Sequence, residues 1–106
     1  MDTESLRGLA RLAYDRALAK QNLEVTMQSR LTVVHNNGVF TVTKEQINFL
    51  DLLGSQDVVI LDDHNIPIMV NAHELLTIMF QRYHEVMNEW HHQYNEQARI
   101  RTAKQL

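Results

Sequence analysis

The feature that most constrains the fold is a helical pattern in the last third of the chain, from Asn71 to about Ala98. Apolar residues recur there at alternating steps of three and four, which places them on one face of an α-helix. The stripe contains Leu76, Met79, Tyr83, Val86 and Trp90, and it is widened by Leu75, Phe80, Met87 and Tyr94. Such a helix is about 40 Å long, whereas a typical strand spans about 20 Å. We therefore expect the helix to overhang the sheet that it covers.

Two helix starts are marked by capping boxes, in which a short polar residue caps the helix and a Glu or Gln follows three residues later. Asn71 and Glu74 form one such pair, and Thr43 and Gln46 form the other. The second pair predicts a short helix, which Gly54 ends because glycine readily takes a positive φ.

The first of two predicted β-hairpins joins residues 31–35 to residues 39–42. Asn36, Asn37 and Gly38 between them tolerate the positive φ that a tight turn requires. The alternation of residues 24–27 also allows the first strand to begin earlier, near Val25.

The second predicted hairpin joins residues 58–61 to residues 66–70 through an acidic turn, residues 62–65. Residues 58–61 are apolar on both faces, which is typical of a central strand. Pro67 has no N–H to donate, so the return strand is expected at an edge. Asp62 and Asp63 are turn-forming residues, and we prefer this role to a Ca²⁺ site, which needs more oxygen ligands.

A further helix is predicted at the start of the chain, from about Thr3 to Lys20. Its apolar stripe is rich in alanine, which permits close approach to another element. The stripe consists of Leu6, Leu9, Ala10, Ala13 and Ala17.

These elements predict one α+β domain over residues 1–106. A small antiparallel sheet of about four strands is expected to be covered on one face by helices. The parts are an N-terminal helix (1–22), a hairpin–helix–hairpin (25–70), the long helix (71–98) and a basic tail (99–106).

Charge and composition exclude several classes of protein. The net charge is −3, with an acidic centre and a tail that carries Arg99, Arg101 and Lys104 without any acid. There is no cysteine, which excludes disulfides and thiol chemistry. The N-terminus lacks a signal-peptide pattern, and the longest apolar run of about four residues is far too short to cross a bilayer. These features predict a cytoplasmic protein.

One face of the long helix carries Glu85, Glu89, His92 and Glu96, a pattern close to that of di-metal carboxylate sites. Such sites take ligands from several helices, and the other predicted helices offer few. We therefore interpret this face as a solvated surface and predict no metal, no cofactor and no catalytic residue. The histidines would nevertheless make its charge sensitive to pH.

The runs LTVVHNNGVFTVTKEQINFLDLL and VVILDDHNIPIMVNAHELL, with a final helix ending in MNEWHHQYNEQARIR, give the chain a resemblance to small accessory proteins of large tailed bacteriophages. The resemblance covers about three quarters of the chain. It implies a virion component or an assembly factor, located in the host cytoplasm or in the virion, rather than an enzyme.

The predicted function is accordingly protein–protein interaction, with the chain acting as a homo-oligomer or as a subunit of a larger complex. The expected interface residues are Met87, Trp90, Tyr94, Tyr83, Arg99 and Arg101. For Tyr83, which lies nearer the sheet, packing in the core is the competing interpretation. The alternative function is a small nucleic-acid-binding or regulatory protein that uses its basic termini, although the acidic centre argues against it.

Overall fold

The computed structural model describes residues 3–105, with the side chains of residues 3 and 5–100. It confirms the α+β class. In chain order the elements are α1 (Thr3–Ser29), β1 (Thr32–His35), β2 (Gly38–Thr41), α2 (Lys44–Leu53), β3 (Asp57–Leu61), β4 (Pro67–Asn71) and α3 (Ala72–Gln105).

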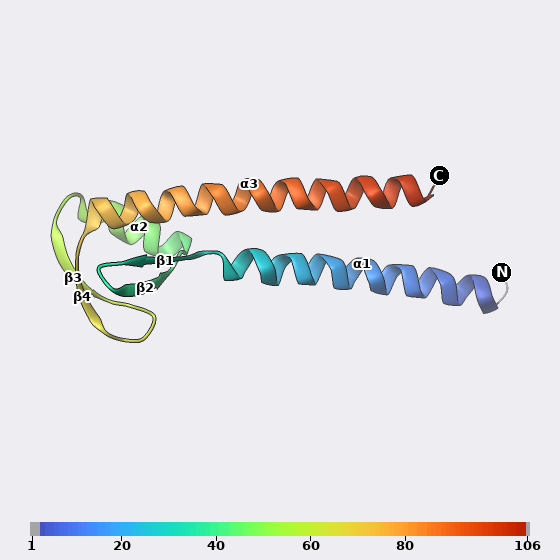
Figure 1. Cartoon of the computed structure of the whole chain (residues 1–106), viewed down its shortest axis with the longest axis horizontal. Coiled ribbons are helices and arrows are strands. Elements are labelled where there is room, and N and C mark those ends of the chain that lie inside the picture. The colour runs from blue at the N-terminus through green and yellow to red at the C-terminus, as the bar shows by residue number, and fades with distance from the viewer. Residues whose placement is uncertain (1–2, 106) are drawn as a thin grey trace.

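The molecule is a rod of 66 × 24 × 20 Å. Figure 1 shows α1 and α3 side by side and running in opposite directions, with both hairpins and α2 gathered at one end. We call that end (residues 30–82) the head, and we call α1 together with residues 83–105 of α3 the arm. The free ends of both helices lie together at the far end of the arm.

Helix α1 is longer than predicted and continues to Ser29, so the proposed strand start near Val25 is wrong. Leu23 and Met27 are four residues apart and both are buried against α3. A helix places residues four apart on the same side, where both can pack against α3. This tertiary contact outweighs the local preference of Val25 and Thr26 for a strand.

The first hairpin forms as predicted, and Val33 pairs with Phe40. The positive φ values are at Asn36 (51°) and Asn37 (66°), as a two-residue turn of type I′ requires. Gly38 serves a different purpose from the predicted one. A Cβ there would lie 2.9 Å from Ile68 Cγ1, so the residue must be small because the second hairpin lies against it.

The four strands form two separate two-stranded sheets rather than one sheet. Within residues 3–105, strand β3 pairs only with β4, so the prediction that residues 58–61 form a central strand is wrong. Val58 and Ile60 face the core, whereas Val59 and Leu61 are each 58% exposed. Strand β3 is therefore apolar on both faces although the described residues cover only one of them. Pro67 lies on an edge strand, as expected.

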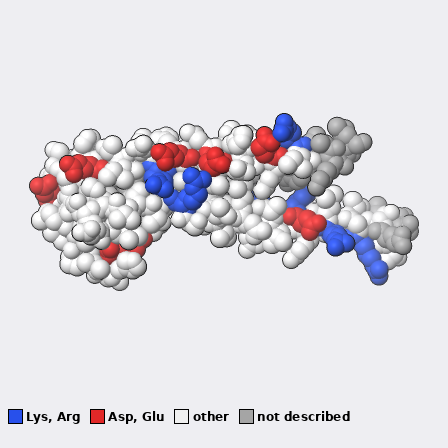
Figure 2. Space-filling view, in the orientation of Figure 1, with Lys and Arg blue, Asp and Glu red and all other residues white. Residues whose placement is uncertain are grey.

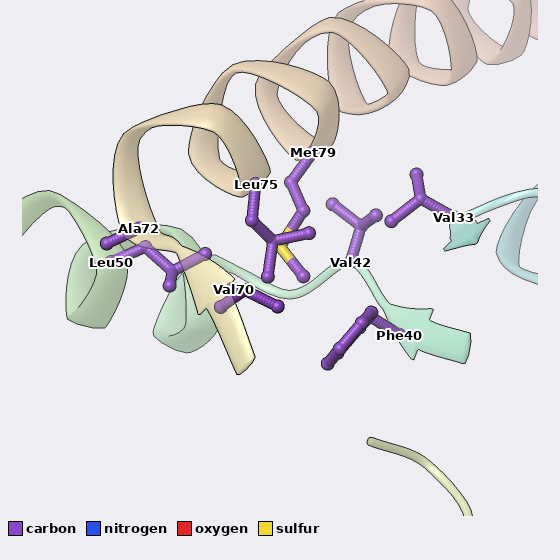
Figure 3. Packing of buried hydrophobic residues seen from close by; sticks show 8 residues of the cluster. All are labelled: Val33, Phe40, Val42, Leu50, Val70, Ala72, Leu75 and Met79. Atoms are coloured by element: carbon purple, nitrogen blue, oxygen red, sulfur yellow. The ribbon is translucent and has the colours of Figure 1, made fainter. Parts of the chain in front are cut away.

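The core of the head lies between the start of α3, α2 and the two hairpins. Figure 3 shows Leu75 and Met79 reaching from α3 toward Val70 and Val42. The buried members are Val33, Phe40, Val42, Leu50, Val70, Ala72, Leu75 and Met79.

Both predicted helix caps are present. The Gln46 N–H donates to Thr43 Oγ1 at 3.1 Å, and the Glu74 N–H donates to Asn71 Oδ1 at 3.1 Å. Gly54 follows α2 with a φ of 66°. Helix α3 extends beyond the predicted end and includes residues 99–105, which we had expected to form a tail.

The acidic turn joins the two hairpins. The Val39 N–H, on the edge of β2 that faces away from β1, donates to Asp62 Oδ2 at 3.1 Å. The Asp63 N–H donates to the Val39 carbonyl at 2.8 Å. The Asp62 carboxylate also accepts from the N–H groups of His64 and Ile66, each at 2.9 Å. The turn therefore continues the ladder beyond β2 and fixes one hairpin against the other.

Candidate interaction surface

The inner half of the arm is held by an apolar contact between its two helices. Leu23 and Met27 of α1 form a buried cluster with Val86 of α3, and Trp90 packs against that cluster. Val86 is completely buried. This contact uses the face of α3 that the long sequence pattern predicted to be apolar.

Farther out, the facing residues become smaller or more polar. Leu12, Arg16 and Ala19 continue the less exposed face of α1, and Gln93 and Gln97 continue that of α3. Their three- and four-residue spacing continues the line from Leu23 and Val86 along each helix. The facing sides of the two helices thus define a seam along the arm.

The predicted apolar stripe of α1 does not lie in this seam. Leu6 and Leu9 are 55% and 56% exposed, and Ala10, Ala13 and Ala17 are exposed as well. At 100° per residue, the stripe is turned by about 90° from the seam, in the direction of increasing residue number. Helix α1 therefore carries an apolar side that the described part of the chain leaves uncovered.

A second stripe lies on α3 and consists of Tyr83, Met87, Tyr94 and Ala98. Around the axis of α3, this stripe also lies about 90° from the residues of the seam, in the direction in which the helix winds as residue numbers increase. Because α1 and α3 are antiparallel, a 90° turn in this direction on each helix leads to the same side of the helix pair. The two stripes therefore lie on the same side of the pair, the α1 stripe toward the free ends and the α3 stripe toward the head. We call this side the apolar face of the arm.

The opposite face of the arm is charged. Figure 2 shows acidic groups along α3, together with basic groups and an acidic group toward the free end of α1. By helical spacing these include Glu85, Glu89 and Glu96 on α3 and Arg7 and Arg11 on α1. The arm is thus a two-helix layer that is amphipathic as a whole.

The carboxylates of this charged face interact along their own helix. Arg99 binds Glu96 at 2.7 Å, Arg82 lies 3.9 Å from Glu85, and the Gln93 amide donates to Glu89 at 2.9 Å. Within the described residues, no group of three or more His, Asp or Glu side chains is arranged to hold a metal ion.

The predicted interface residues do not all share one environment. Tyr83 is half-buried and packs against the head core, and Trp90 is half-buried in the seam. Met87 is half-buried, and Tyr94 is 44% exposed on the apolar face. Arg99 lies on the charged face in its ion pair, and the side chain of Arg101 lies outside the described residues.

The α1 stripe was not among the predicted interface residues. Its spacing was visible, but a stripe at helical spacing is equally consistent with packing inside the chain. Only the position of α3 decides that Leu6 and Leu9 remain exposed. A shallow groove of about 540 Å³ lies at the head end, between α2 and α3, where Ile47, Leu76 and the half-exposed Phe80 provide its apolar lining.

Comparison with protein-family models finds no match, and neither the curated proteins nor the solved structures yield one. Among the described helices, none has the length and apolar content needed to cross a membrane.

Proposed function

We propose that this chain is a non-enzymatic interaction protein that assembles through the apolar face of its arm, as an oligomer or as a subunit of a larger complex. The observation that carries the proposal is the stripe of α1, centred on Ala13, which the described residues leave uncovered on the same side of the arm as the partly exposed stripe of α3. Large exposed apolar surfaces are rare on a protein that acts alone.

The dimensions of the arm suit an interface. The side of the arm that carries the two stripes spans two adjacent helices, each about 40 Å long and about 10 Å wide, and has an area on the order of 800 Å², of which the stripes occupy about half. Stable complexes bury about 800 Å² on each partner. The resemblance to bacteriophage accessory proteins would place such an assembly in a virion or an assembly intermediate, in the host cytoplasm or in the particle.

The experiment compares the mass in solution of the wild type and of two variants that each gain one negative charge. Ala13→Glu places a carboxylate in the centre of the α1 stripe, whereas Asn22→Glu places one on the charged side of the same helix. We expect the wild type to associate at tens of micromolar and Ala13→Glu to be monomeric, because burying an unpaired carboxylate is costly. Asn22→Glu should associate like the wild type.

Circular dichroism should show the same helix content for all three proteins, because both residues are exposed in the monomer. A wild type that stays monomeric at tens of micromolar contradicts the oligomer. Equal association of Ala13→Glu and Asn22→Glu excludes the apolar face as the interface.

Nucleic-acid binding is a second candidate, because the structure brings the basic end of α1, with Arg7 and Arg11, beside the basic end of α3. The acidic stripe on α3 and the pairing of Arg99 with Glu96 weaken this candidate. Binding to duplex DNA that falls steeply with salt concentration would support it, and no binding at low salt would dismiss it.

A further inference from the structure

We propose that the free edge of β3 binds an extended segment of a partner protein, which adds as a third strand to the β3–β4 hairpin. The segment has apolar side chains along one side and basic residues at its ends. This interface lies in the head and uses no residue of the apolar face of the arm. It therefore goes beyond the proposed function and does not depend on it.

The hydrogen bonds at the two ends of the hairpin fix which backbone groups of β3 face away from β4. The Asp62 N–H donates to the Ile66 carbonyl at 3.0 Å, and the Ala72 N–H donates to the Gln56 carbonyl at 2.9 Å. Both pairs continue the register of β3 and β4. In an antiparallel ladder, hydrogen-bonded pairs alternate with pairs whose N–H and C=O groups point outward. The outward groups of β3 are therefore those of residues 57, 59 and 61.

Two of the four strands have outer edges that are already occupied. On β2, the N–H and C=O of Val39 and the N–H of Thr41 bond to the acidic turn. On β4, Pro67 has no N–H, and the Met69 carbonyl accepts from the Asn36 side-chain amide at 3.0 Å. Neither edge offers the row of free donors and acceptors that an added strand needs.

The edges of β1 and β3 differ in what flanks them. Arg82 and Glu85 of α3 line the groove beside β1, and charged side chains are one means by which proteins protect an edge. The groove beside β3 has a volume of about 580 Å³ and lies between that strand and α2, with Phe49, Val59 and Leu61 in its lining. Within residues 3–105, no hydrogen bond reaches the outward backbone groups of β3. This edge is therefore open to an added strand.

The side chains around the edge define the segment that it fits. Val59 and Leu61 lie on the uncovered face of the hairpin, so apolar side chains of an added strand can pack beside them. Asp57 lies at one end of the edge, and Glu45 lines the groove. Residues 30–71 of the head have two basic and five acidic groups, a net charge of −3. This charge favours a segment with basic ends over a second copy of the head.

A labelled peptide tests the edge directly. The probe is fluorescein-labelled Lys-Thr-Val-Thr-Val-Thr-Lys, which alternates residues of high β-propensity and places both valines on one face. Its binding is measured by fluorescence anisotropy, and the same peptide with glutamate in place of both lysines is the charge control. Val59→Pro removes an outward N–H and leaves the β3–β4 ladder intact. Met69→Pro makes the same change opposite it, on the outer edge of β4, and is the matched control.

The lysine peptide should bind the wild type, and Val59→Pro should weaken this binding at least about tenfold, because the ring of proline occupies the edge. Met69→Pro should change binding by less than about twofold, and the glutamate peptide should bind the wild type at least about fivefold more weakly. Circular dichroism establishes that each variant is folded. If Val59→Pro unfolds, Val59→Lys replaces it, because an edge lysine leaves the backbone unstrained and should weaken binding in the same way.

The lysine peptide failing to bind the wild type at about 1 mM, or binding folded Val59→Pro equally well, overturns the assignment of the edge. Equal binding of the two peptides overturns the basic ends of the partner segment. Self-association that Val59→Pro abolishes and Met69→Pro retains would mean that a second copy occupies the edge, and this too overturns the partner proposed here. Ala13→Glu should bind the peptide like the wild type, so failure of the arm interface leaves this test unaffected.

Discussion

Asp63 binds Thr41 of the other hairpin at two points. One oxygen of its carboxylate accepts from the Thr41 backbone N–H at 3.0 Å, and the other accepts from the Thr41 hydroxyl at 2.6 Å. Residues that the sequence marks only as turn formers thus connect the two small sheets, neither of which is expected to be stable alone.

Replacing Asp63 with Ala should lower the free energy of unfolding by about 1 kcal/mol, because two exposed hydrogen bonds are lost. Urea unfolding followed by circular dichroism measures this. Thr41→Val, which removes only the hydroxyl, should cost less. An Asp63→Ala variant as stable as the wild type would mean that the connection between the hairpins contributes nothing.

Asp62 makes stability depend on pH. Its pKa lies below the ordinary value of 3.8, chiefly because the Ile66 N–H donates to the carboxylate, with further donation from Val39 and His64 opposed by burial. Because the pKa of Asp62 is lower in the native protein than in the unfolded chain, its ionised carboxylate stabilises the fold. This stabilisation is complete when the pH is above the pKa of the unfolded chain. That stabilisation is lost as the pH falls through 3.8 and then through the native pKa.

The wild type should therefore lose more stability between about pH 5 and pH 2 than Asp62→Asn does, because the asparagine cannot be protonated in this range. Denaturant unfolding at a series of pH values gives both curves. Parallel curves for the two proteins would show that the Asp62 carboxylate is not stabilised by these donors.

Two leucines of α2 provide a matched test of the head core. Leu50 is fully buried, whereas Leu52 is 86% exposed. Leu50→Ala should cost about 2–5 kcal/mol through lost burial and the cavity that remains. Leu52→Ala should change the free energy of unfolding by less than about 0.5 kcal/mol. Similar losses for both variants would contradict the packing described for α2.

Trp90 and Tyr94 are expected to behave differently although both belong to the predicted interface. Trp90 packs against the cluster of Leu23, Met27 and Val86, so Trp90→Ala should destabilise the arm by about 2 kcal/mol and speed amide exchange in α1. Tyr94→Ala should leave stability nearly unchanged and weaken association. Hydrogen exchange measures the stability of the arm, and solution mass measures association. If Tyr94→Ala destabilised the arm and Trp90→Ala only weakened association, the roles assigned to these two residues would be wrong.

The sequence by itself determined the local elements. Thr43 and Asn71 identified two helix starts, and the asparagine pair before Gly38 identified a hairpin, because caps and turns depend on neighbouring residues. The sequence also showed that α3 was too long for the sheet beneath it.

Only the tertiary structure decided which partner each apolar surface receives. Helical spacing is the same whether a stripe packs inside the chain or remains exposed. The sequence therefore predicted that α1 is a helix but not which of its sides is buried. The cluster of Leu23, Met27 and Val86 holds α1 in a helix through a segment with strand character, and it covers Trp90 in part. It also fixes which side of α1 faces α3, and this leaves Leu6 and Leu9 exposed. The long helix that constrains the fold is therefore half of a two-helix arm, and the pairing of the two helices creates the apolar face.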